Sequence, residues 1–142
     1  MVNVAALKEH VNAYKINLQT APEFFKQMFT LYPDMAKYFD AEDIDPDSIP
    51  KSRKFQQMSV SALKEILGLP LEFEEGVNFR GAVKNCAGYY KEQGVSYEDF
   101  KKLPSVVCKV MEIQAGGCSD EQRKAWEDLF SEAYKIIDEA GY

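Results

Sequence analysis

The stretch FKQMFTLYPDMAKYF, residues 25–39, joins a strongly apolar helical segment to a turn that begins with a proline. Phe25, Met28 and Phe29 recur at the three- and four-residue spacing that places side chains on one side of a helix. Pro33 cannot continue the hydrogen-bonded ladder of that helix, so it starts a short turn. The turn ends at Phe39, six residues later. We therefore predict a helix with a broad apolar face, followed directly by a compact turn.

Upstream of this stretch, the apolar spacing predicts an opening helix from Val4 to about Leu18. The sequence from Thr20 to Glu23 has the pattern of a capping box, in which a threonine oxygen accepts from a first-turn amide and the glutamate reaches back. Pro22 is acceptable there because amides in the first helical turn have no partner within the helix.

Downstream, residues 40–50 contain five acidic residues and two prolines, and we interpret them as a solvated loop. A further helix is expected from Lys51, with an apolar stripe that includes Phe55, Met58 and Ala62, and Gly68-Leu-Pro70 ends it.

Three more helices follow. The first covers Val77 to Tyr90, and Gly94 breaks the chain after it. Ser96 caps the next, which contains Pro104 and should bend there. Gly116-Gly117 ends that helix, and a second capping box, Ser119 to Gln122, starts the last one. With no alternating segment, residues 1–142 are expected to form a single all-α domain with crossed helices.

The composition restricts the classes of partner. The chain has 142 residues, 46% of them hydrophobic, and a formal net charge of -6. An acidic surface repels phosphate groups, so neither nucleic acid nor a membrane is an expected partner. The N-terminus lacks the pattern of a signal peptide, and three cysteines without paired spacing fit a reducing compartment, so a cytoplasmic location is expected. Cys86, Cys108 and Cys118 are expected to be small buried or half-buried residues.

Four segments together resemble the globin family, and more narrowly the invertebrate globins of nematode or annelid type. They are residues 25–39, 51–55, 94–100 and 120–126. The resemblance implies a globin-like fold of about six to eight helices around a central apolar pocket. Globins open their short third helix with a proline and place a phenylalanine on the haem face six residues later. Pro33 and Phe39 stand at this spacing.

The resemblance also assigns pocket positions. Phe25 takes the distal place on the second helix, with Phe29 on the same apolar face, and Phe39 takes the haem-stacking place. Met58, give or take one position, takes the distal ligand-gating place, which is usually a histidine or glutamine. Ala62 lies one turn further along the same wall. Apolar side chains at Phe25 and Met58 offer no hydrogen bond to bound oxygen.

The proximal position departs from the family. In globins, the histidine that holds the iron is followed by a Gly-Val pair five residues on. An aromatic or leucine residue follows ten residues on. Here Gly94, Val95 and Phe100 point back to Tyr90, or to Tyr89 with a slip of one residue.

Neither of these tyrosines can supply an imidazole to iron. The single histidine, His10, lies in the opening helix and is expected at its surface or edge. Tyrosine can ligate ferric haem, which makes Tyr90 a candidate metal ligand. Cys86, one turn earlier, is a second candidate if a partner lowers the pKa of its thiol.

Three functions stay open at this point. The first is a pocket protein that binds a small hydrophobic or tetrapyrrole-like ligand without histidine-ligated haem. The second is a haem protein with Tyr90 as the iron ligand, and the third is a cofactor-free interaction protein. No glycine-rich phosphate loop, zinc-ligand spacing or supported nucleophile–histidine pair is present, so an enzyme is not expected. The sequence is compatible with a monomer or a homo-oligomer.

Overall fold

The computed structural model describes residues 1–142 and contains eight α-helices, two 3-10 helices and no strand. The all-α prediction is therefore confirmed. In chain order the elements are α1 (Val4–Asn12), α2 (Glu23–Leu31), η1 (Pro33–Phe39), η2 (Pro46–Lys51), α3 (Arg53–Leu67), α4 (Leu69–Glu75), α5 (Phe79–Glu92), α6 (Tyr97–Phe100), α7 (Leu103–Gln114) and α8 (Asp120–Ala140).

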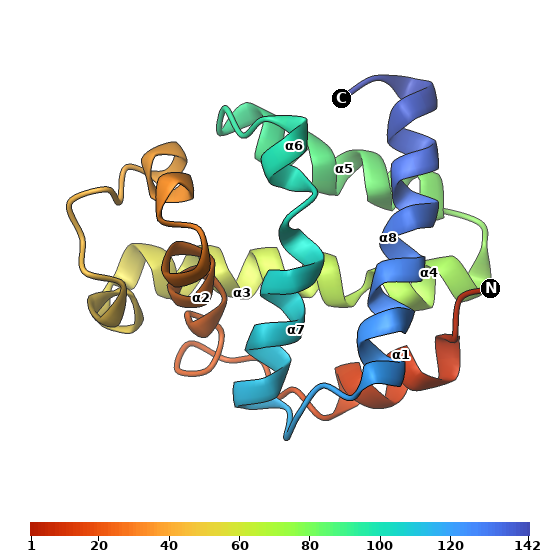
Figure 1. The fold of residues 1–142 in the computed structure, drawn as a ribbon, viewed down its shortest axis with the longest axis horizontal. Helices are drawn as coiled ribbons and strands as arrows, with labels where there is room; N and C mark the ends of the chain where they lie inside the picture. The colour runs from red at the N-terminus through yellow and green to blue at the C-terminus, as the bar shows by residue number, and fades with distance from the viewer.

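The helices cross one another rather than running parallel. α7 and α8 lie in front in Figure 1, and α3 passes behind them at a steep angle. α2 packs against α3, α7 and η2, whereas α8 packs against α1, α5 and α7. One continuous cluster of 38 buried apolar residues fills the space between these elements. This arrangement agrees with the crossed packing that the sequence predicts.

The opening helix is shorter than predicted, ending at Asn12 instead of near Leu18. The hydroxyl of Thr20 donates to the carbonyl of Lys15 at 2.6 Å and accepts from the amide of Asn17 at 3.1 Å. This hydroxyl is therefore committed to the preceding turn. The predicted capping box at Thr20 is wrong, because the N-cap of α2 is Pro22, which makes no side-chain cap hydrogen bond.

Residues 40–50 are not entirely a solvated loop. Their second half begins the 3-10 helix η2, whose first turn is capped by the Asp45 carboxylate accepting from the amide of Asp47 at 3.0 Å. Ile49 of this helix is completely buried. Ala41 is buried as well, whereas the acidic residues of this segment stay exposed. The acidic composition therefore did not indicate that two apolar side chains of the segment belong to the core.

Two prolines start helices that the sequence analysis did not separate. α3 does end at Gly68, but α4 follows at once, with Pro70 in its first turn. The helix expected to bend at Pro104 is instead two helices, α6 and α7, and Pro104 lies in the first turn of α7. A first-turn proline loses no helical hydrogen bond, which explains why the chain breaks before it. The Ser119–Gln122 capping box is confirmed.

His10 is not at the surface, contrary to expectation. Its side chain is 1% exposed, and Trp126 Nε1–H of α8 donates to its Nδ1 at 3.0 Å. His10 Nε2–H then donates to the carbonyl of Gly117 at 2.8 Å. Burial lowers the pKa of His10, and the hydrogen bond to Gly117 opposes this shift in part. The imidazole is thus a neutral link between α1, α8 and the turn before α8.

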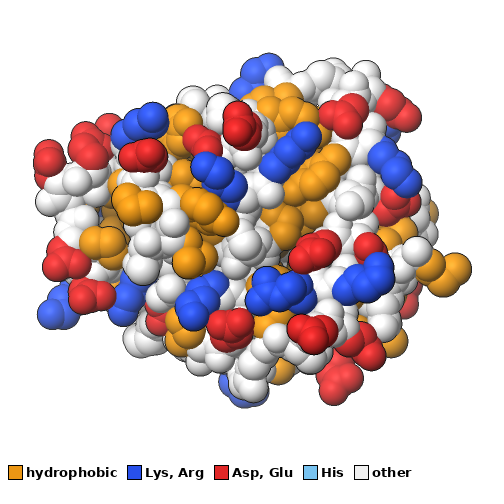
Figure 2. Space-filling view, in the orientation of Figure 1, with side chains coloured by type: hydrophobic (Ala, Val, Ile, Leu, Met, Phe, Trp, Pro, Cys, Tyr) orange, Lys and Arg blue, Asp and Glu red, His pale blue; other side chains and the backbone are white.

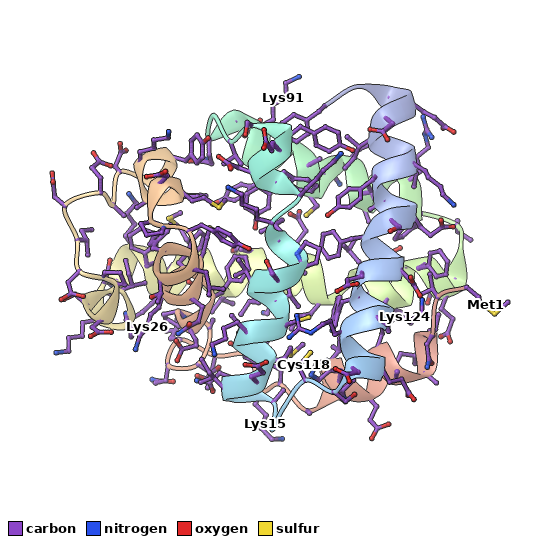
Figure 3. The ribbon with its side chains drawn as sticks, viewed as in Figure 1. Met1, Lys15, Lys26, Lys91, Cys118 and Lys124 are labelled. Atoms are coloured by element: carbon purple, nitrogen blue, oxygen red, sulfur yellow. The ribbon has the colours of Figure 1, made fainter.

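Charged side chains of both signs are interspersed over the face shown in Figure 2, with small apolar areas between them. No helix combines the length and apolar character needed to cross a membrane. Side chains fill much of the space between the helices (Figure 3).

Candidate functional site

A cavity of about 370 Å³ lies between α3 and α5. Its volume falls near the lower end of the range of roughly 300–1,000 Å³ that small-molecule pockets occupy. The residues that line it are Gln57, Met58, Ser61, Ala62, Glu65 and Tyr89. All but Tyr89 are on α3, at the spacing of one helical face. The cavity is therefore a half-open cleft, with one face of α3 as its main wall and one aromatic ring from α5 beside it.

Three of these residues, Met58, Ala62 and Tyr89, are among the candidate site residues from the sequence. Sequence reasoning missed Gln57, Ser61 and Glu65. Ser61 lies three residues after Met58, and Glu65 three after Ala62, so extending the same helical face would have identified both.

Four phenylalanines pack together in the interior, and none of them lines the cavity. The ring of Phe25 lies 5.0 Å from that of Phe39 and 5.4 Å from that of Phe55, between ring centres. Phe29 lies 5.9 Å from Phe39 and 5.8 Å from Phe55. The structure therefore brings Phe25, Phe29 and Phe39 together, as a packed aromatic cluster whose rings contact one another and do not line the cavity.

Tyr90 lies next to the cavity but does not line it. Its side chain is 1% exposed, and its hydroxyl has no hydrogen-bond partner. Its ring contacts those of Tyr89 and Phe100, at 5.0 and 5.6 Å between centres. The amide of Val95 donates to the carbonyl of Tyr90 at 3.0 Å, which fixes the end of α5. Burial raises the pKa of the Tyr90 phenol well above its ordinary value.

A phenolate ligand needs a nearby cation, and two basic residues of α5, Arg80 and Lys91, do not supply one to Tyr90. Arg80 pairs with Glu139 of α8 at 3.0 Å, and Lys91 projects outward from the fold in Figure 3. Cys86 is buried, and its thiol lies near the carboxyl group of Glu65. Burial is the main cause that raises the pKa of the Cys86 thiol, and the nearby carboxylate of Glu65 raises it further. Cys86 is therefore present as the neutral thiol rather than the thiolate.

This donor set fits a haem iron poorly. A phenol ligates iron as phenolate, and the burial of Tyr90 opposes that charge without a cation to offset it. Cys86 is protonated for the same reason, and His10 has both ring nitrogens engaged at the other side of the core. None of the residues that line the cavity is basic, so carboxylate groups of a tetrapyrrole find no cation there. No group of three or more metal-ligating side chains is present either.

Glu65 provides the only charge on the cavity wall. Burial raises the pKa of its carboxyl group, and the nearby thiol of Cys86 opposes that shift. Burial and the nearby Glu65 also raise the pKa of the Tyr89 phenol. The site thus combines two apolar side chains, one carboxyl group and neutral hydrogen-bonding groups.

A sequence model of the globin family matches residues 22–137. The chain is 30% identical to a myoglobin of Nippostrongylus brasiliensis over 112 residues, which cover 78% of this chain and 72% of that protein. It is 26% identical to a globin-like host-protective antigen of Trichostrongylus colubriformis over 113 residues, covering 79% of this chain and 65% of that relative. The chain thus spans slightly less than two thirds of the second protein. No solved structure matches significantly.

Proposed function

This chain belongs to the globin family, and from that premise we propose that it binds a small organic ligand between α3 and α5 without histidine-ligated haem. The observation that carries the proposal is the cavity of about 370 Å³, walled by Met58 and Ala62 together with neutral polar groups. Apolar walls with a few convergent polar groups are typical of small-ligand sites. On this reading the protein is a binding protein rather than an enzyme or a reversible oxygen carrier.

Two features of the chain disfavour oxygen carriage: the position of its one imidazole and the side chain of Met58. Bound oxygen in a globin requires ferrous haem, which an imidazole holds. The single imidazole of this chain accepts from Trp126 and donates to Gly117, far from α5. On the opposite wall, Met58 has a thioether that cannot donate a hydrogen bond to bound oxygen.

The first test combines an absorption spectrum of the purified protein with a melting experiment. We expect no Soret band, and we expect 2-phenylethanol to raise the melting temperature, because a ligand that binds only the folded state stabilises it. Ser61→Phe should abolish this shift by placing a ring in the cavity. Lys64→Phe is the matched control, because Lys64 is exposed on the same helix but does not line the cavity. A shift that survives Ser61→Phe would contradict this binding site.

A second candidate function, haem held by Tyr90, has one observation in its favour, the buried hydroxyl without a partner, and one against it, the cost of a buried phenolate. Haem would supply an iron centre to which this oxygen could bind. Addition of haem should then produce a Soret band that Tyr90→Phe removes and Tyr89→Phe retains. Because the hydroxyl of Tyr90 makes no hydrogen bond, its removal leaves the packing unchanged, and the fold should persist. A band that both variants retain excludes Tyr90 as the ligand.

A further inference from the structure

Glu65 lies in the cavity without a compensating cation. It takes part in none of the eight ion pairs of the structure. The neutral thiol of Cys86 lies near its carboxyl group, and no basic side chain lowers the pKa of Glu65. A half-buried carboxylate has lost part of its hydration, and a nearby neutral thiol replaces little of it. The cavity therefore has a negative group with unused capacity to accept hydrogen bonds.

The rest of the cavity separates into an apolar part and a polar part. Met58 and Ala62 form the apolar part, and the hydroxyl of Ser61 lies on the same helical face as Glu65. Tyr89 closes the cavity from α5 with an aromatic ring, whose face attracts cations. A ligand that contacts all of these groups needs an apolar body and a positively charged head.

We propose that this cavity selects small organic amines, with the protonated amine bound by Glu65 and the apolar body lying against Met58 and Ala62. Ammonium–carboxylate hydrogen bonds are among the stronger ones in proteins, and partial desolvation strengthens them further. A carboxylate ligand is disfavoured by repulsion from Glu65, and a neutral alcohol gains only ordinary hydrogen bonds. This inference rests on the proposed function, because it specifies the chemical class of ligand that the same cavity binds.

The test compares three probes with the same phenyl body and different heads: 2-phenylethylamine, 2-phenylethanol and 3-phenylpropanoate. Titration calorimetry on the full chain at pH 7.5 should give the amine an affinity at least tenfold above that of the alcohol, or about 1.4 kcal/mol. The carboxylate should bind most weakly. Glu65→Gln should remove the advantage of the amine and leave the affinity for the alcohol within about twofold.

Glu75→Gln is the matched control, because it changes the net charge equally at an exposed residue that does not line the cavity. It should retain the preference for the amine, which excludes general attraction of cations to an acidic protein. Equal binding of all three probes, or an amine preference that survives Glu65→Gln, would overturn this inference and leave the proposed cavity intact. If none of the three probes binds, both the proposed function and this inference fail.

Discussion

His10→Ala should destabilise the protein substantially, although the residue lies far from the candidate site. The imidazole is 1% exposed and accepts from Trp126 Nε1–H at 3.0 Å. Its removal leaves that buried donor without a partner, which costs about 1–3 kcal/mol. The space left by the ring adds about 2 kcal/mol, by comparison with other large-to-small core substitutions. We therefore expect a total loss of about 3–5 kcal/mol.

The loss should also depend on pH in a defined direction. The pKa of His10 is lowered in the folded state, whereas an unfolded histidine titrates near about 6.5. The unfolded chain therefore binds more protons below that pH, and the stability contributed by neutral His10 is present above pH 6.5 and declines as the pH falls. The maximal slope for one such group is about 1.4 kcal/mol per pH unit. The difference between wild type and His10→Ala should narrow from pH 7.5 to pH 5.

Urea unfolding followed by tryptophan fluorescence measures both effects. At pH 7.5 the midpoint should fall by about 2 M, taking an m-value near 2 kcal/mol/M. Glu9→Ala is the control, because Glu9 is exposed on the same helix, and its effect should stay within about 0.5 kcal/mol at each pH. All other carboxylates are the same in the wild type, His10→Ala and Glu9→Ala, so their contribution cancels in the differences.

The structural role assigned to His10 is wrong if His10→Ala costs less than about 1 kcal/mol. It is equally wrong if the difference from wild type stays constant or widens as the pH falls. Either result would mean that the imidazole is hydrated, or already protonated, in the folded protein.

Three further outcomes follow from packing and capping. Phe25→Ala should lower the unfolding free energy by about 3–5 kcal/mol in urea, since its ring contacts a closed aromatic cluster; a loss under about 1 kcal/mol would mean that this end of the interior is open. Ser119→Ala should cost about 1 kcal/mol by removing an N-cap oxygen from α8, measured in the same way, and no change would contradict the cap. Cys118 is half-buried at the turn between α7 and α8 (Figure 3), whereas Cys86 and Cys108 are buried. Iodoacetamide should therefore alkylate Cys118 well before the other two, as measured by peptide mass spectrometry. Equal rates at the three cysteines would contradict their burial.

Local signals predicted much of the helical structure. The apolar spacing of residues 25–29 and the proline at Pro33 indicated α2 and the turn after it, because both depend on neighbours within a few residues. The capping box predicted at Ser119 is present, because it too depends only on residues within one helical turn. The box at Thr20 failed because the hydroxyl bonds backward to Lys15, an alternative that the sequence pattern permits equally well.

The candidate site was predicted in part. Met58 and Ala62 follow from helical periodicity together with the family resemblance, and both line the cavity. Phe25 and Phe39 were expected to face a ligand, but they contact each other and the neighbouring rings. Whether two apolar side chains face a ligand or one another depends on the distance between helices, and periodicity carries no information about that distance.

By itself, the sequence determined that no imidazole stands at Tyr90 and that His10 is the one histidine available to the fold. Only the tertiary structure decided where these groups lie and what they contact. His10 meets Trp126 and Gly117 across 116 and 107 residues of chain, and the hydroxyl of Tyr90 is enclosed without a partner beside a cavity that Glu65 makes acidic. Burial and hydrogen bonding arise from contacts between distant segments, and these contacts set the charge state of each group.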